Sequence, residues 1–179
     1  MRADDILYFW FTEAGPDAWW TKSKAFDDLV RRRFCALYDA AAKGELSGWR
    51  DRAEGRLAEI IVLDQFPRNM FRDSARAFGS DTMALALSQE AVRLGVGADW
   101  NADRRAFLYM PYMHSESVAV HEDALELFAG PGLENNLDFE RRHKAIIDRF
   151  GRYPHRNAVL GRVSTPEEIE FLKQPGSSF

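Results

Sequence analysis

The 179-residue sequence has few of the residues that several common chemistries require. Its single cysteine, Cys35, excludes an internal disulfide and any cysteine-based zinc site. Its longest apolar runs, such as residues 6–11, are far shorter than the ~20 residues that span a bilayer. Asp4 and Asp5 precede that run, unlike the basic start of a secretory signal peptide. We therefore expect a soluble cytoplasmic protein without membrane partners.

Motifs of several protein classes are also missing. The sequence has no glycine-rich nucleotide-binding loop, and Ser115 lacks the G-x-S-x-G context of a serine hydrolase. His114 and His121 share a helical face but have no third ligand and no H-E-x-x-H spacing, so we predict no metal site. A net charge of −4 disfavours nucleic acid as a partner. We expect no cofactor.

Lysine is scarce, and arginine is abundant. The 24 basic residues comprise 19 arginines and 5 lysines. The planar guanidinium suits buried carboxylates and other anions, because it donates parallel hydrogen bonds. Residues 116–140 carry acidic but no basic side chains, whereas residues 149–162 carry four arginines and no acidic side chain. These blocks either neutralise each other across a helical hairpin or form a site for an external anion.

The apolar periodicity is helical nearly throughout the chain. A capping box at Asp51–Glu54 predicts a helix start, and Pro67 predicts that this helix ends near Phe66. Thr165-Pro166 marks the start of the last helix. Apolar residues spaced by three or four predict further helices over about 23–43, 81–94, 104–113, 118–128 and 137–150.

No segment shows the period-two alternation and turn chemistry of a β-hairpin. The small and large residues of Ala84–Leu87 alternate, as they do in packed helical hairpins whose alanines permit close approach. We therefore predict a single all-α domain over residues 1–179, built from stacked antiparallel helical hairpins.

A short motif occurs twice, each time after a predicted helix. Phe66–Asn69 and Tyr153–Asn157 both contain an aromatic residue, a proline, an arginine and an asparagine in that order, which suggests two equivalent corners. Pro154 is predicted to open a short helix closed by Gly161. The free N–H groups of such a helix, with the neighbouring arginines, would bind an anion. Alternatively, the arginines and asparagines hold the loops in place.

His114 is the second candidate for chemistry. It follows Pro111, which leaves a backbone carbonyl without its helical partner. A histidine here can act as a general base near neutral pH, with Glu116 or Asp64 orienting it. The alternative is a histidine whose hydrogen bonds are satisfied in the core.

Several blocks of sequence form a recognisable series along the chain. They are Leu7–Phe11, Leu63–Asn69, Arg76–Phe78, Leu108–Pro111, His114–Glu116, Arg149–Asn157, Leu160–Arg162 and Ser164–Thr165. In this order they resemble the bacterial domain-of-unknown-function family 924. The resemblance extends from Ile6 to Leu172 and implies a tetratricopeptide-repeat-like fold, a right-handed α-α superhelix, but no activity. One departure is His121, where the family pattern leads us to expect glutamine.

Three hypotheses about function follow. The leading one is a pocket that binds a small anionic molecule or an acidic peptide segment. The second is a cofactor-free hydrolase or isomerase with His114 or His155 as general base. The third is a protein–protein adaptor in which the polar blocks are purely structural. The predicted pocket residues are Arg68, Asn69, His114, Glu116, Arg152, His155, Arg156 and Asn157.

Overall fold

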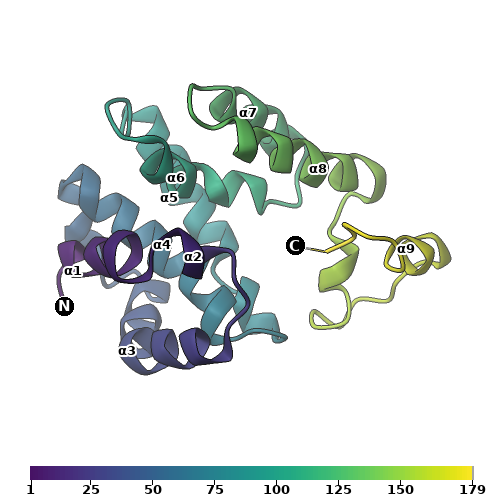
Figure 1. Ribbon diagram of the computed structural model, residues 1–179, viewed down its shortest axis with the longest axis horizontal. Helices are drawn as coiled ribbons and strands as arrows, with labels where there is room; N and C mark the ends of the chain where they lie inside the picture. Colours follow the sequence, from purple (N-terminus) through teal and green to yellow (C-terminus); the bar gives the residue numbers. More distant parts are fainter. Residues whose placement is uncertain (179) are drawn as a thin grey trace.

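The computed structural model describes residues 1–178, which form helices and connecting turns without β-strands (Figure 1). The predicted all-α class is therefore confirmed. The long helices are α3 (Lys24–Ala42), α4 (Ala53–Met70), α5 (Asp81–Arg93), α6 (Ala102–Met113), α7 (Val118–Phe128) and α8 (Glu134–Phe150). The short helices are α1 (Ala3–Tyr8), α2 (Gly15–Trp19) and α9 (Pro166–Phe171). A π-helical turn, η1 (Phe9–Ala14), and the 3-10 turns η2 (Ser47–Asp51), η3 (Ala75–Phe78) and η4 (Pro154–Arg156) complete the set.

Each long helix from α3 to α8 packs against the next one along the chain (Figure 1). This order of contacts agrees with the predicted stacking of helical hairpins, while the right-handed superhelix remains a prediction. The segment after α8 lies beside the stacked helices and carries α9 (Figure 1). Across residues 1–178, no helix combines the length and apolarity that crossing a membrane requires.

Helix α4 forms the centre of the main core. It contacts α1, α3, α5 and α6, and every residue from Leu57 to Pro67 is buried. A helix that is buried on all sides needs neighbours on all sides. Within this core the rings of Phe34 and Phe66 stack with centroids 4.7 Å apart.

Helix α4 differs from its prediction at both ends. It continues through Pro67 to Met70, so the predicted end near Phe66 was wrong. A proline inside a helix costs about 3 kcal/mol, and burying a large apolar side chain gains about 1.5–3 kcal/mol. The complete burial of both Phe66 and Met70 therefore offsets the loss. The predicted capping box was also wrong, because Asp51 lies in η2 and Arg52 is the N-cap, without a side-chain cap bond.

Other predicted boundaries are confirmed within a few residues. The side chain of Ser23 caps α3, and Gly151 ends α8 in the left-handed conformation with φ of 67°. Thr165 and Glu168 form the capping box of α9. The helix predicted after Pro154 is shorter than expected, since η4 has three residues. It is too short to supply the predicted anion site of a helix N-terminus.

Candidate functional site

Two arginines from distant parts of the sequence converge on one carboxylate. Arg68 of α4 donates from Nη1 and Nη2 to the two carboxylate oxygens of Asp81, each over 2.9 Å. Arg156 of η4 donates from Nη1 to Oδ2 of the same carboxylate over 3.3 Å. Together with Asp64 and His114, described below, these residues form what we call the Arg–Asp–His cluster. The two similar motifs thus meet, although one lies in an α-helix and the other in a 3-10 turn.

The guanidinium of Arg156 lies close to two aromatic rings. Its central carbon lies 4.5 Å from the ring centroid of Phe78 and 4.5 Å from that of Tyr153. Nη2 donates to the backbone carbonyl of His114 over 3.1 Å, while buried Nε has no acceptor among residues 1–178. Burial, and then the charge of Arg68, lower the pKa of Arg156. The positive charge of Arg156 is thus incompletely compensated.

His114 and Asp64 form a hydrogen-bonded pair. Nδ1 of His114 lies 2.8 Å from Oδ1 of Asp64, and Nη1 of Arg68 lies 3.2 Å from the same oxygen. Although burial opposes ionisation, Arg68 and His114 hold the pKa of Asp64 well below its usual range. Burial, followed by the charge of Arg68, lowers the pKa of His114, so the ring is neutral near pH 7. Of the two acids predicted to orient His114, the structure therefore pairs it with Asp64.

His121 forms a second histidine–carboxylate pair, with a different chemistry. Its Nδ1 lies 2.6 Å from Oε1 of Glu140, and its Nε2 lies 2.9 Å from the backbone carbonyl of Ser115. Both side chains are fully buried, and burial raises the pKa of Glu140. A carbonyl oxygen only accepts, so Nε2 of His121 carries a proton. His121 is therefore a core residue with both ring nitrogens engaged.

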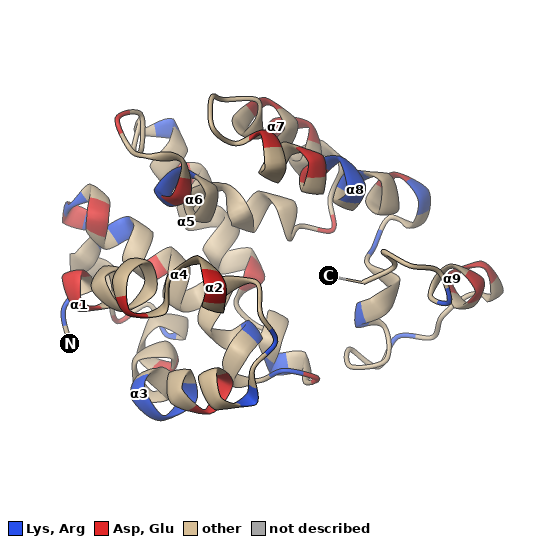
Figure 2. Cartoon of the chain, viewed as in Figure 1, with Lys and Arg blue, Asp and Glu red and all other residues tan. Residues whose placement is uncertain are grey.

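Glu116 belongs to a network next to the cluster. Its carboxylate accepts hydrogen bonds from Nη1 and Nη2 of Arg162 over 2.6 and 2.9 Å and from the backbone N–H of Tyr153 over 2.7 Å. Arg162 Nε also donates to Asn157, whose Nδ2 donates to Ser164. The Glu116–Arg162 pair joins the acidic block to the arginine block, whereas the other three arginines pair with acids outside residues 116–140, namely Arg149 with Glu167, Arg152 with Glu168 and Arg156 with Asp81. Figure 2 shows acidic residues along α7 and basic residues in the segment after α8.

Two predicted pocket residues bond outside the cluster. Arg152 donates from Nε and Nη2 to Glu168 of α9 over 2.6 and 2.8 Å. Nδ2 of Asn69 donates to the carboxylate of Asp27 in α3 over 2.9 Å. Nε of Arg72 donates to the same carboxylate over 2.7 Å. These contacts stabilise two helix junctions, and they give Arg152 and Asn69 partners outside the Arg–Asp–His cluster.

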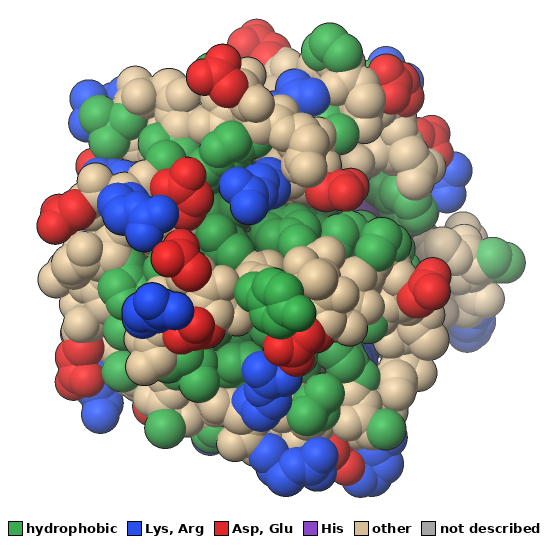
Figure 3. Space-filling view, turned by 60° about the vertical axis from the view of Figure 1, so that its left-hand side comes forward, with side chains coloured by type: hydrophobic (Ala, Val, Ile, Leu, Met, Phe, Trp, Pro, Cys, Tyr) green, Lys and Arg blue, Asp and Glu red, His purple; other side chains and the backbone are tan. Residues whose placement is uncertain are grey.

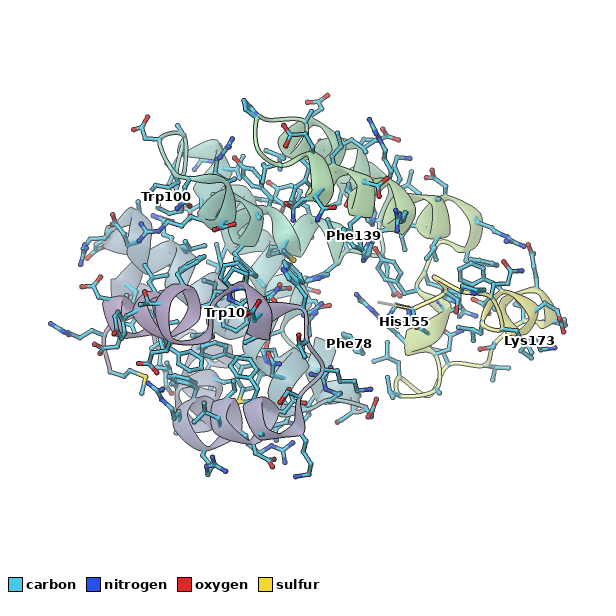
Figure 4. All side chains as sticks on the ribbon, in the orientation of Figure 1. Trp10, Phe78, Trp100, Phe139, His155 and Lys173 are labelled. Carbon is cyan, nitrogen blue, oxygen red and sulfur yellow. The ribbon has the colours of Figure 1, made fainter. Side chains whose placement is uncertain are left out.

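His155 remains close to the cluster. Its ring centroid lies 5.5 Å from that of Tyr153, and burial lowers the pKa of the imidazole to about 4. Figure 4 shows His155 on the side of the C-terminal segment that faces the helices, close to Phe78 in that view.

The predicted pocket residues leave out three residues that build the site. Asp81 is an acidic residue in the first turn of a helix, a common pattern that does not indicate its two arginine partners. Phe78 lies in one of the family blocks, and Tyr153 is the aromatic residue of the second repeated motif, so both had a signal in the sequence. Within the part of the chain that the structure describes, no three histidine, cysteine, aspartate or glutamate side chains are grouped to hold a metal ion.

The open depressions of the surface lie elsewhere. One is lined by α5, α6 and α7 and includes Gln89, Tyr112 and Asp123. Another is lined by residues of α1, η1, α4 and α6, including Tyr8 and Arg104. Neither contains a predicted pocket residue. In Figure 3, apolar side chains are interspersed with charged ones over the visible face.

The comparisons with known proteins agree with the resemblance seen in the sequence. The family model for a bacterial protein of unknown function (DUF924) matches residues 6–176. The chain is 42% identical to the solved structure of a protein of unknown function, ATU0120, from Agrobacterium tumefaciens. That match has a TM-score of 0.90 and covers 96% of each chain. No curated protein matches the chain. The chain therefore belongs to the bacterial DUF924 family, whose function is unknown.

Proposed function

We propose that the Arg–Asp–His cluster binds a small anionic ligand. The observation that carries this proposal is the buried Nε donor of Arg156, which has no acceptor among the described residues. A buried donor without an acceptor costs about 1–3 kcal/mol, and a ligand oxygen would recover that free energy. The 3.3 Å bond from Arg156 to Asp81 is also longer than the 2.7–2.9 Å expected of a charge-assisted hydrogen bond.

The geometry of Arg156 favours a carboxylate or a phosphate. The rings of Phe78 and Tyr153 lie against the guanidinium, so we expect a ligand to bind along an edge that carries N–H donors. Nε and the second proton of Nη2 form one edge, and two parallel donors match two oxygens of one anion. The side chains of Arg68, Asp81 and His114 are 20%, 17% and 13% exposed, so the cluster is in contact with solvent at these residues.

The proposal is tested by titrating the protein with succinate and with inorganic phosphate. We expect the NMR signal of the Arg156 Nε–H group to shift with either anion. Binding at a hundredfold excess over Kd stabilises the native state by about 2.7 kcal/mol, which a thermal melt detects.

A pair of variants localises the effect. Arg156→Lys retains the charge but loses the Nε donor, so we expect at least about tenfold weaker binding. Arg142→Lys is the matched control, because Arg142 lies on α8 with its side chain 61% exposed. Equal affinities in the two variants, or no shift of the Arg156 signal, would contradict the proposal.

A further inference from the structure

The two histidine–carboxylate pairs differ in what they offer to a ligand. The ionised carboxylate of Asp64 only accepts hydrogen bonds, so Nδ1 of His114 carries the proton. In the neutral ring, Nε2 of His114 then has an unshared electron pair. No hydrogen bond within residues 1–178 uses that nitrogen. The corresponding Nε2 of His121 is buried and donates to the carbonyl of Ser115.

The free nitrogen lies in the same cluster as the proposed anion site. The backbone carbonyl of His114 accepts from Arg156, while its side chain shares Oδ1 of Asp64 with Arg68. Two guanidinium groups therefore lie beside a base that is 13% exposed. Guanidinium groups stabilise negative charge that develops on oxygen during a reaction.

We infer that His114 acts as the general base in the hydrolysis of esters that carry a free carboxylate. This inference rests on the proposed function. The free carboxylate is bound by Arg156, and the ester carbonyl lies towards Arg68 and His114. Asp64 acts as a positioning residue, since it fixes the tautomer and orientation of the imidazole.

The reaction needs water and no other co-reactant. Nε2 of His114 removes a proton from water as the water oxygen bonds to the carbonyl carbon. The carbonyl electron pair moves onto its oxygen, where the guanidinium of Arg68 stabilises it. The tetrahedral intermediate then breaks its bond to the alcohol oxygen, which takes the proton from His114. The products are the alcohol and a second carboxyl group, which releases the remaining proton of the water to solvent and leaves a dicarboxylate.

The first test determines the tautomer without any substrate. Long-range proton–nitrogen NMR spectra at neutral pH should show His114 protonated at Nδ1 and unprotonated at Nε2. Asp64→Asn removes the charge that fixes this arrangement, so its spectrum should show a mixture of tautomers. A wild-type ring protonated at Nε2 would overturn the inference.

The second test measures methanol release by NMR. Monomethyl succinate carries the free carboxylate, whereas methyl butanoate lacks it, and we expect hydrolysis of the former alone. His114→Gln should lower this rate by about 100-fold, as expected for the loss of a general base. Arg142→Lys, which changes an exposed side chain of α8, should hydrolyse the ester at the wild-type rate.

The outcomes separate the two proposals. If succinate shifts the Arg156 signal but monomethyl succinate is not hydrolysed, the general-base inference fails and anion binding stands. The same holds if His114→Gln hydrolyses the ester as fast as wild type. If succinate produces no shift, both proposals fail.

Discussion

At the residue scale, Gly55 has the most restrictive packing environment among the glycines. A Cβ atom at this position would lie 1.9 Å from the backbone carbonyl oxygen of Trp49. Because that neighbour is backbone rather than a flexible side chain, the start of α4 would have to move away from η2. The close approach of these two elements therefore depends on the missing side chain.

We predict that Gly55→Ala lowers the free energy of unfolding by about 3 kcal/mol, as expected of severe overpacking. Gly48→Ala is the control, because a Cβ there meets no heavy atom within 4 Å. Urea unfolding of both variants measures the difference. Similar unfolding midpoints would show that α4 and η2 do not pack this closely.

Residue-scale reasoning from the sequence found one side of the cluster. The repeated motif singled out Arg68 and Arg156, and both reach the cluster. It did not find Asp81, because an acidic residue in a first helical turn is common in any helix. A partner distant in the chain leaves no local pattern, so the pairing required the folded structure.

At the scale of elements, α9 is held by one main ion pair. Glu168 accepts two hydrogen bonds from Arg152 and one, over 2.7 Å, from the backbone N–H of Thr165. By contrast, the Arg149–Glu167 pair is largely exposed, and pairs of that kind contribute little. The attachment of α9 should therefore depend on Arg152 far more than on Arg149.

We predict that Arg152→Gln increases hydrogen exchange in α9, whereas Arg149→Gln leaves it nearly unchanged. The physical reason is that Glu168 is buried and loses its charged partner only in the first variant. Mass spectrometry of peptides that cover α9 measures the exchange. Equal exchange in both variants would contradict this role of the Arg152–Glu168 pair.

The same pair predicts an acid-induced loosening of α9. Hydrogen bonds from Arg152, foremost, lower the pKa of Glu168 to about 2 from the ordinary 4.5. A carboxyl group with a depressed pKa stabilises the folded state above its ordinary pKa and loses that effect as the pH falls. The backbone amide signal of Thr165 should therefore change between pH 4.5 and about 2. If the Thr165 signal finished changing above pH 4.5, the change would not come from protonation of Glu168.

Element prediction succeeded where the signal was local. Thr165 marked the start of α9 correctly, because caps depend on residues within one turn. The predicted bounds near residues 23 and 150 also agree with the observed ends of α3 and α8. The end of α4 was missed because Pro67 is a local signal that the burial of Phe66 overrides. Packing against four other helices is not visible in the local sequence.

At the scale of the whole molecule, two buried histidines make stability dependent on pH. Burial lowers the pKa of His143 to about 3 and that of His155 to about 4. The positive charge of Arg156 lowers the pKa of both histidines further. The charges of Arg68 and Arg162 also lower the pKa of His155, whereas the negative charge of Glu116 raises it. His114 and His121 act on His143 in the same direction as Arg156.

In the unfolded chain both histidines would take up a proton near the ordinary pKa of 6.5. The unfolded state then binds more protons than the folded state, so stability falls as the pH drops from 6.5 towards about 4. Each histidine contributes a slope of about 1.4 kcal/mol per pH unit. Urea unfolding at several pH values measures how the free energy of unfolding changes with pH. His155→Gln removes one of the two histidines and should reduce this slope by about 1.4 kcal/mol per pH unit. A free energy of unfolding that stays constant across this range would contradict the prediction.

The residues of the Arg–Asp–His cluster lie far apart in the sequence, and this affects the order in which parts of the structure form during synthesis. The buried residues of the main core lie between Ile6 and Met110, so a growing chain can bury them before its last third emerges. Asp81 and Phe78 then face water until η4 brings Arg156 against them. The Arg–Asp–His cluster, where we propose that an anion binds, is thus completed only when η4 has packed against the main core.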